Sequence, residues 1–142
     1  MYKLDSRLSE DTLKIGTFNL CDALLMNNSL LPWVILVPRR TGIREIYELN
    51  EADQFSLLNE SMLVSKTLMT EFKGDKLNTA AIGNIVPQLH LHHVIRYQYD
   101  SAWPKPVWGN IPAKPYTQTT SKQALKKFRT LFTNASGNFV SN

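Results

Sequence analysis

The sequence is short of cysteine and of long hydrophobic runs. Its one cysteine, Cys21, cannot form an intramolecular disulfide, which excludes a disulfide-stapled scaffold and favours a reducing compartment. The longest apolar run, Leu30 to Val37, is interrupted by Pro32 and is far shorter than the roughly 18 to 20 residues of a membrane-spanning helix. The N-terminal residues mix charges of both signs where a secretory signal needs an apolar stretch. We therefore predict a cytoplasmic protein with no membrane partner.

Internal repeats, low-complexity blocks and linkers are also lacking. A chain of 142 residues that is 43% hydrophobic can bury one compact core but is too short for two ordinary domains. The sequence predicts a single domain over residues 1–142. Its net charge of +4 favours an anionic partner, but no nucleic-acid-binding motif accompanies the basic C-terminal segment, so we expect no nucleic acid partner.

Hydrophobic patterns predict two early strands and one long helix. A first strand covers Lys14 to Met26 and ends at the turn Asn27 to Ser29, and a second covers Trp33 to Val37. The helix runs from Asn50, its N-cap, to Lys73 beside Gly74. One stripe of residues recurs at steps of three and four and predicts the face that packs on a sheet; it consists of Phe55, Leu58, Met62, Ser65, Met69 and Phe72.

The second half of the chain predicts one more strand and a final helix. Residues 88–98 are rich in β-branched and aromatic side chains, which is typical of a strand. Residues 101–120 hold prolines and tryptophans and predict an irregular arm, whereas Ser121 to Phe132 predict a helix and residues 134–142 a flexible tail. The expected fold is an α+β domain with an antiparallel sheet, one long helix across it and a C-terminal helix.

All three histidines of the chain lie within one stretch, QLHLHHVIR. Because side chains alternate along a strand, Gln88, His90 and His92 share one face and His93 faces the other way. Such a row of polar side chains on an apolar strand indicates a site. Three interpretations remain open: ordinary structural histidines, a zinc site, or phosphate chemistry in which one imidazole attacks and its neighbour shares hydrogen bonds.

The zinc interpretation lacks further ligands at a suitable spacing. We predict neither a metal site nor a cofactor.

The segment GNIVPQLHLHHVIR, residues 83–96, resembles the signature of the histidine triad (HIT) family, His-φ-His-φ-His-φ-φ, in which φ is an apolar residue. His90 and His92 match the second and third histidines, Gln88 stands where the first would be, and His93 fills an apolar position. LLPWVILVPRR and SAWPKPVWG are similar to further segments of the family, the latter in a bacterial branch described as diadenosine tetraphosphate hydrolase-like.

The resemblance implies a nucleotide hydrolase or nucleotidyl transferase that acts on dinucleoside polyphosphates or related conjugates. By this resemblance His90 attacks the α-phosphorus and forms a nucleotidyl-histidine intermediate, and His92 contacts the phosphate oxygens. Asn78 and Asn84 resemble phosphate-binding positions. Asn27, with Asn28 as the alternative, resembles a ribose-binding position. The family also implies a homodimer, with the strand edge or the arm at Trp103 and Trp108 as contact surfaces; the alternative for these tryptophans is intramolecular cover.

Gln88 is the departure from the family pattern. Glutamine donates and accepts hydrogen bonds but carries no titratable proton. We therefore predict slower turnover than with three histidines, and a gain in turnover for Gln88→His. The alternative function is a nucleotide-binding module with little or no activity.

Overall fold

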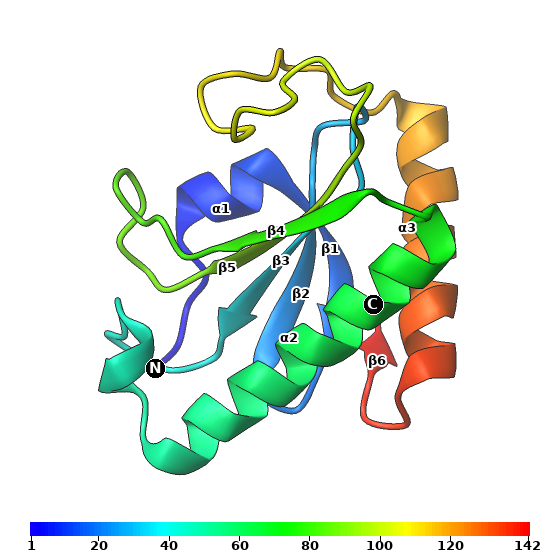
Figure 1. Ribbon diagram of the computed structural model, residues 1–142. Helices are drawn as coiled ribbons and strands as arrows, with labels where there is room; N and C mark the ends of the chain where they lie inside the picture. Colours follow the sequence, from blue (N-terminus) through cyan, green and yellow to red (C-terminus); the bar gives the residue numbers. More distant parts are fainter.

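The computed structural model describes residues 1–142 and has the expected α+β architecture. A six-stranded antiparallel sheet with the order β4-β5-β3-β2-β1-β6 forms its centre (Figure 1). The elements are α1 Ser6–Asp11, β1 Thr12–Thr17, β2 Cys21–Met26, β3 Trp33–Pro38, the 3-10 helix η1 Ile46–Glu48, α2 Glu51–Phe72, β4 Lys76–Ala80, β5 Leu91–Arg96, α3 Gln118–Ala135 and β6 Val140–Ser141. No helix is long and apolar enough to cross a membrane.

The first predicted strand is wrong, because residues 14–26 form two strands. Between β1 and β2 the chain reverses over residues 18–20, where the carboxylate of Glu60 accepts hydrogen bonds from the backbone N–H groups of Leu20 and Cys21. This acceptor lies about forty positions away in the sequence, so no local pattern predicts the turn. The antiparallel pairing of β2 with β3 across the predicted turn is confirmed.

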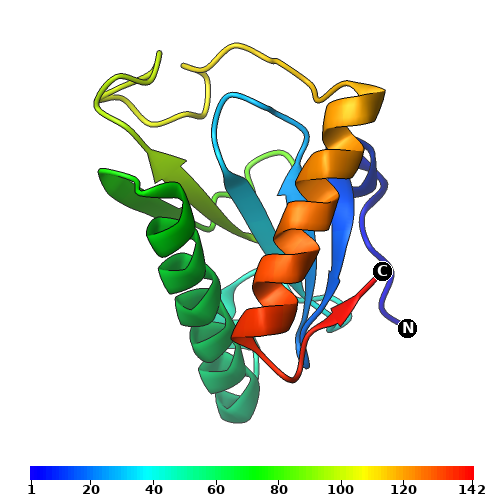
Figure 2. The same ribbon diagram turned by 90° about the vertical axis from the view of Figure 1, so that its right-hand side faces the viewer.

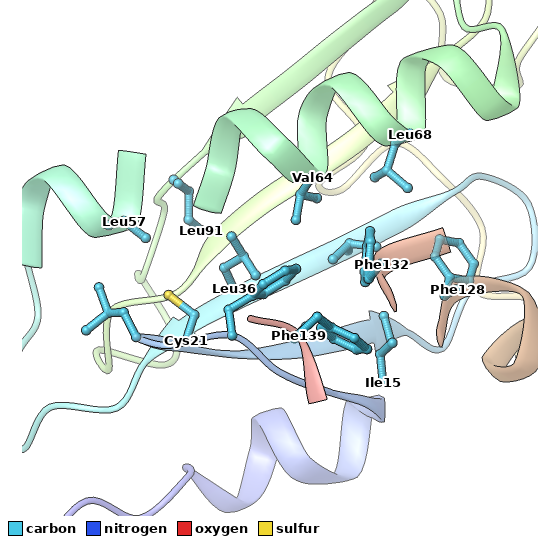
Figure 3. Packing of buried hydrophobic residues seen from close by; sticks show 14 of the residues in the cluster. Ile15, Cys21, Leu36, Leu57, Val64, Leu68, Leu91, Phe128, Phe132 and Phe139 are labelled. Carbon is cyan, nitrogen blue, oxygen red and sulfur yellow. The ribbon is translucent and has the colours of Figure 1, made fainter. Parts of the chain in front are cut away.

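The sheet is covered on both faces, which explains the apolar sequences of β2 and β3. Helices α2 and α3 cover one face and bury the larger hydrophobic cluster (Figure 3), which includes Leu36, Val64 and Phe132. The N-terminal segment, α1 and the arm cover the other face, where Leu8, Ile35 and Val107 belong to a second cluster. In Figure 2 the N-terminal segment, in blue, lies across the sheet from α2.

Helix α2 begins and ends as predicted, but only the second half of the predicted stripe packs on the sheet, where Ser65 is buried and Met69 and Phe72 contact the larger cluster. Asn50 caps it by accepting a hydrogen bond from the N–H of Asp53, and Lys73 ends it in the left-handed conformation. The buried side chains are Asp53, Leu57, Ser61, Val64, Ser65 and Leu68. Phe55, Leu58 and Met62 of the predicted stripe are 60%, 54% and 50% exposed. Apolar residues occur on several sides of the helix, so periodicity alone does not select the buried side. The hydrogen bond between Ser61 and His93 of β5 lies on the side that faces the sheet.

The C-terminal residues are more ordered than predicted. Helix α3 extends to Ala135 and starts with a capping box of Thr117 and Thr120. Beyond it, β6 pairs with β1, so residues 134–142 hold a helix end and a strand in place of the predicted tail. Phe139 packs on Phe18 and Phe132, which anchors this end of the chain in the larger cluster.

Strand β5 is shorter than predicted. It starts at Leu91, so Gln88 and His90 precede it. Strand β4 was not predicted, because its sequence KLNTA is only partly buried and lacks a clear alternation of apolar side chains. It forms one edge of the sheet.

Candidate active site

Two neighbouring cavities open on the sheet face that α1 and the arm cover. The first, here called the histidine cavity, has a volume of about 410 Å³ and is lined by Arg7, Leu8, Glu10, Asp11, Thr12, Met26, Ile35, Ile82, Gly83, Asn84, Ile85, Val86, His90, His92 and Trp108. The second, of about 430 Å³, shares Glu10, Asp11, Met26 and Trp108 with it and adds Asn27 and Asn28. Together they form a two-part site beside the histidines.

His90 has its tautomer set by a backbone carbonyl. Its Nδ1 lies 2.7 Å from the carbonyl oxygen of Gln88. Because a carbonyl oxygen only accepts hydrogen bonds, Nδ1 carries the proton and Nε2 of the neutral ring keeps its lone pair. A neutral imidazole with a free lone pair is the form needed for nucleophilic attack.

His92 is held in the opposite tautomer. The indole Nε1–H of Trp33 donates to Nδ1 of His92 over 2.9 Å, and both residues are buried. Indole is a donor only, so Nδ1 is the acceptor and Nε2 of the neutral ring carries the proton. Burial, with smaller effects of His90 and His93, lowers the pKa of His92 to about 3. At neutral pH this residue is therefore an uncharged hydrogen-bond donor through Nε2.

The two rings lie next to each other, as the strand alternation predicts. Their centroids are 5.0 Å apart, and the ring of Trp108 packs edge-on against His92 at 5.1 Å. One ring thus offers a lone pair and its neighbour an N–H group at the same cavity.

His93 lies on the opposite face of the sheet, as expected, and is fully buried there. Its Nδ1 donates to the carbonyl of Val34 over 3.2 Å, which leaves Nε2 to accept from the hydroxyl of Ser61 over 2.7 Å. Burial lowers the pKa of His93 to about 4. Both nitrogens are satisfied inside the protein, which is a structural arrangement.

Comparison with known proteins decides the family. The HIT domain profile matches residues 7–99. The chain belongs to the histidine triad (HIT) family. HIT proteins bind nucleotides and are generally nucleotide hydrolases or transferases.

Crystal structures of HIT proteins match almost the whole chain. A histidine triad protein from Marinobacter aquaeolei is 53% identical, with a TM-score of 0.92 over 96% of this chain and 99% of its own. One from Bradyrhizobium japonicum is 42% identical, with a TM-score of 0.87 over 91% of this chain and 96% of its own. One from Sinorhizobium meliloti is 41% identical, with a TM-score of 0.86 over 89% and 94%. No curated protein sequence matches.

Gln88, which by resemblance stands at the first position of the HIT motif, does not line either cavity. Its side-chain Nε2 donates to the carbonyl of Lys3, and its Oε1 accepts from the N–H of Asp5, each over 2.9 Å. Only its backbone carbonyl contacts a site histidine, His90. The Gln88 side chain, which the sequence predicts on the same face as His90 and His92, is therefore engaged with the N-terminal segment.

The four asparagines expected to contact a nucleotide lie in three different surroundings. Asn84 is exposed, lines the histidine cavity and makes no side-chain hydrogen bond. Asn27 and Asn28 line the second cavity. Asn27 uses only Oδ1, for Tyr116, whereas Asn28 uses both its amide groups within the protein. Asn78 lines neither cavity.

Asn78 instead supports a buried ion pair. Its Oδ1 accepts from Arg96, which also donates twice to the carboxylate of Asp100. Burial alone would raise the pKa of Asp100, but hydrogen bonds from Arg96 and from backbone N–H groups outweigh it and lower this pKa to about 2. Asn78 on β4 therefore helps to hold Arg96 at the end of β5.

Sequence reasoning missed several polar and aromatic residues of the candidate site. Arg7, Glu10 and Asp11 come from the short helix α1, and Trp33 and Trp108 contact His92. Asp5 before an Arg-Leu-Ser-Glu run was a usable N-cap signal for α1. No local signal connects the tryptophans with the histidines. No group of three or more His, Cys, Asp or Glu side chains forms a candidate metal site.

Proposed function

We propose that this protein cleaves nucleotide conjugates at the α-phosphate and that His90 forms a nucleotidyl-histidine intermediate. The opposite tautomers of His90 and His92 carry this proposal. The hydrogen bond to Gln88 leaves a lone pair on Nε2 of His90, and the hydrogen bond from Trp33 leaves a proton on Nε2 of His92. A nucleophile and a donor for phosphate oxygens thus stand side by side.

In the first step, the lone pair of His90 Nε2 forms a bond to the α-phosphorus, and the leaving group departs with the electrons of its own bond to phosphorus. The imidazole becomes cationic, so its Nδ1–H hydrogen bond to the Gln88 carbonyl strengthens. In the second step, water or another acceptor attacks phosphorus and the P–N bond returns its electrons to Nε2. The proton of the acceptor passes to solvent.

His92 stabilises the phosphate oxygens as an uncharged donor. Since the pKa of His92 is lowered to about 3, it carries no second proton to give to a leaving group at neutral pH. Gln88 has no titratable proton either. The leaving group must therefore be good by itself or be protonated by solvent, which supports slower turnover on poor leaving groups.

The charges around the site bear on the substrate class. Arg7 is the one Lys or Arg side chain that lines the histidine cavity, and Glu10 and Asp11 line it too. A long polyphosphate would meet two carboxylates and one cation there. Among the conjugates implied by the family, this surrounding favours a nucleoside phosphoramidate or another single-phosphate conjugate over diadenosine tetraphosphate.

We also propose a homodimer. The edge of β4 is unpaired in the single chain, and Phe55, Leu58 and Met62 expose apolar surface on α2. An open edge and an apolar helix face are typical of surfaces that pair with a second copy. Light scattering should give about twice the chain mass of 16.2 kDa, and Leu58→Glu should give the monomer. A wild-type monomer at micromolar concentration would refute this assembly.

The experiment compares the wild type with His90→Ala on an adenosine phosphoramidate and on diadenosine tetraphosphate. We expect AMP release by the wild type and a loss of about 10⁴-fold or more in the variant, as for removal of other covalent nucleophiles. Gln98→Ala is the matched control, because Gln98 is exposed on the chain after β5 and its side chain makes no hydrogen bond.

The outcome separates the two functions considered for this chain. AMP release that depends on His90, with an acid-labile label on the protein after rapid quenching, supports the enzyme. AMP binding without turnover in any condition would instead support a nucleotide-binding module.

A further inference from the structure

Gln88 makes a pair of hydrogen bonds that a partner strand would otherwise make. The carbonyl of Lys3 and the N–H of Asp5 both face its side chain, and each is bonded to it over 2.9 Å. Backbone groups of residues i and i+2 point to the same side of an extended chain. One planar amide therefore satisfies the inward-facing groups on both sides of Leu4.

The N-terminal segment that Gln88 binds leads directly into the cavity. Asp5 is the N-cap of α1 and accepts a hydrogen bond from the N–H of Arg7 over 2.8 Å. Arg7 in turn donates to the carbonyl of Ile85 in the loop before β5. Arg7 and Ile85 both line the histidine cavity, as do three further residues of α1, namely Leu8, Glu10 and Asp11.

The same segment is attached to the sheet at its other end. The hydroxyl of Tyr2 donates to Asp22 over 2.9 Å, and the side chains of Tyr2 and Leu4 pack against the second hydrophobic cluster. Between this contact and α1, the amide of Gln88 provides the side-chain hydrogen bonds to the backbone of the segment.

We propose that Gln88 is a positioning residue that links the α1 side of the cavity to the nucleophile. Its side chain fixes Lys3 to Asp5 and hence the start of α1, while its backbone carbonyl fixes the tautomer of His90. This role needs no proton transfer, which a glutamine side chain cannot provide. It accounts for a glutamine here, because both its amide groups are used.

Histidine cannot reproduce this pair of bonds. The oxygen and nitrogen of a carboxamide branch from one carbon and meet two neighbouring backbone groups, whereas the nitrogens of an imidazole point in different directions from its ring. In Gln88→His, at least one of the groups on Lys3 and Asp5 loses its partner. Gln88→Glu keeps the acceptor for Asp5 but removes the donor to Lys3, so its effect should be intermediate.

The test combines hydrogen exchange with kinetics on the wild type, Gln88→Ala, Gln88→His, Gln88→Glu and the control Gln98→Ala. Each lost hydrogen bond changes an opening equilibrium about fivefold. The amides of residues 5–11 should therefore exchange up to about 30-fold faster in Gln88→Ala and Gln88→His, with β2 and β3 unchanged. For activity, KM should rise about tenfold and kcat should stay within about threefold, because the substrate must reorder the α1 side of the cavity.

Among these variants, Gln88→His tests the positioning role of Gln88 most directly. A gain in kcat, or exchange over residues 5–11 equal to that of the wild type, would overturn the positioning role. The kinetic arm rests on the function proposed above, whereas the exchange arm does not. If the wild type neither cleaves a conjugate nor binds AMP, the proposed function fails while exchange still decides the role of Gln88.

Discussion

Replacement of Trp33 by phenylalanine tests the tautomer on which the proposed chemistry depends. The Trp33 N–H is the donor to Nδ1 of His92, at positions only 3% and 5% exposed. Its removal leaves a buried acceptor unpaired, which costs about 1–3 kcal/mol. The smaller ring adds roughly 1 kcal/mol for imperfect filling of the space. We expect a loss of about 2–4 kcal/mol in the free energy of unfolding.

Trp108→Phe is the matched control, because the indole N–H of Trp108 is buried without a partner. Trp108→Phe makes the same change of ring size but breaks no hydrogen bond. The free energy of unfolding should therefore fall only by the packing contribution of about 1 kcal/mol. Denaturant titration measures both variants. ¹⁵N NMR of the histidine rings then reports the tautomer of His92, which should be Nε2–H in the wild type and mixed in Trp33→Phe.

The reasoning fails if Trp33→Phe keeps His92 entirely as the Nε2–H tautomer, or if the two tryptophan variants are equally stable. In either case the hydrogen bond from Trp33 does not set the state of His92. A changed tautomer should also lower turnover, because Nε2 of His92 would face the phosphate as an acceptor in part of the molecules.

Three further outcomes follow from buried groups. Asp100→Asn removes the charge that pairs with Arg96, whose side chain is 1% exposed. The free energy of unfolding, measured by denaturant titration, should fall by about 3–5 kcal/mol. A fall of less than about 1 kcal/mol would contradict a tight ion pair. His92 and His93 have pKa values lowered to about 3 and 4. Below pH ~6.5 the unfolded chain therefore binds more protons than the folded one. The free energy of unfolding should fall from pH ~6.5 toward pH ~4, by up to about 1.4 kcal/mol per pH unit for each of the two histidines. Stability that stays flat over this range would show that the two rings protonate freely. Gly16→Ala would place a methyl group against the carbonyl of Val140 and the ring of Phe139, and should lower the melting temperature by several degrees. An unchanged melting temperature would contradict the packing of the C-terminal residues on β1.

Local sequence patterns determined much of this protein. The alternation predicted for residues 88–98 puts His90 and His92 together and His93 on the other face, as observed, although β5 itself begins only at Leu91 and the Gln88 side chain does not join the histidines. The N-cap at Asn50 and the end near Lys73 were also readable, because capping depends on residues within one turn of the helix end. The motif around the histidines indicated the HIT family, to which the chain belongs.

The roles of individual side chains were decided by partners far away in the sequence. Trp33 and His92 are 59 positions apart, and Gln88 is 83 positions from Asp5. The rotation of α2 was equally hidden, since its apolar residues fit more than one face and the contact of Ser61 with His93 spans 32 positions. Local periodicity fixes which residues share a face. Only the packed sheet brings together the donors and acceptors that set a tautomer or turn a glutamine toward the N-terminal segment.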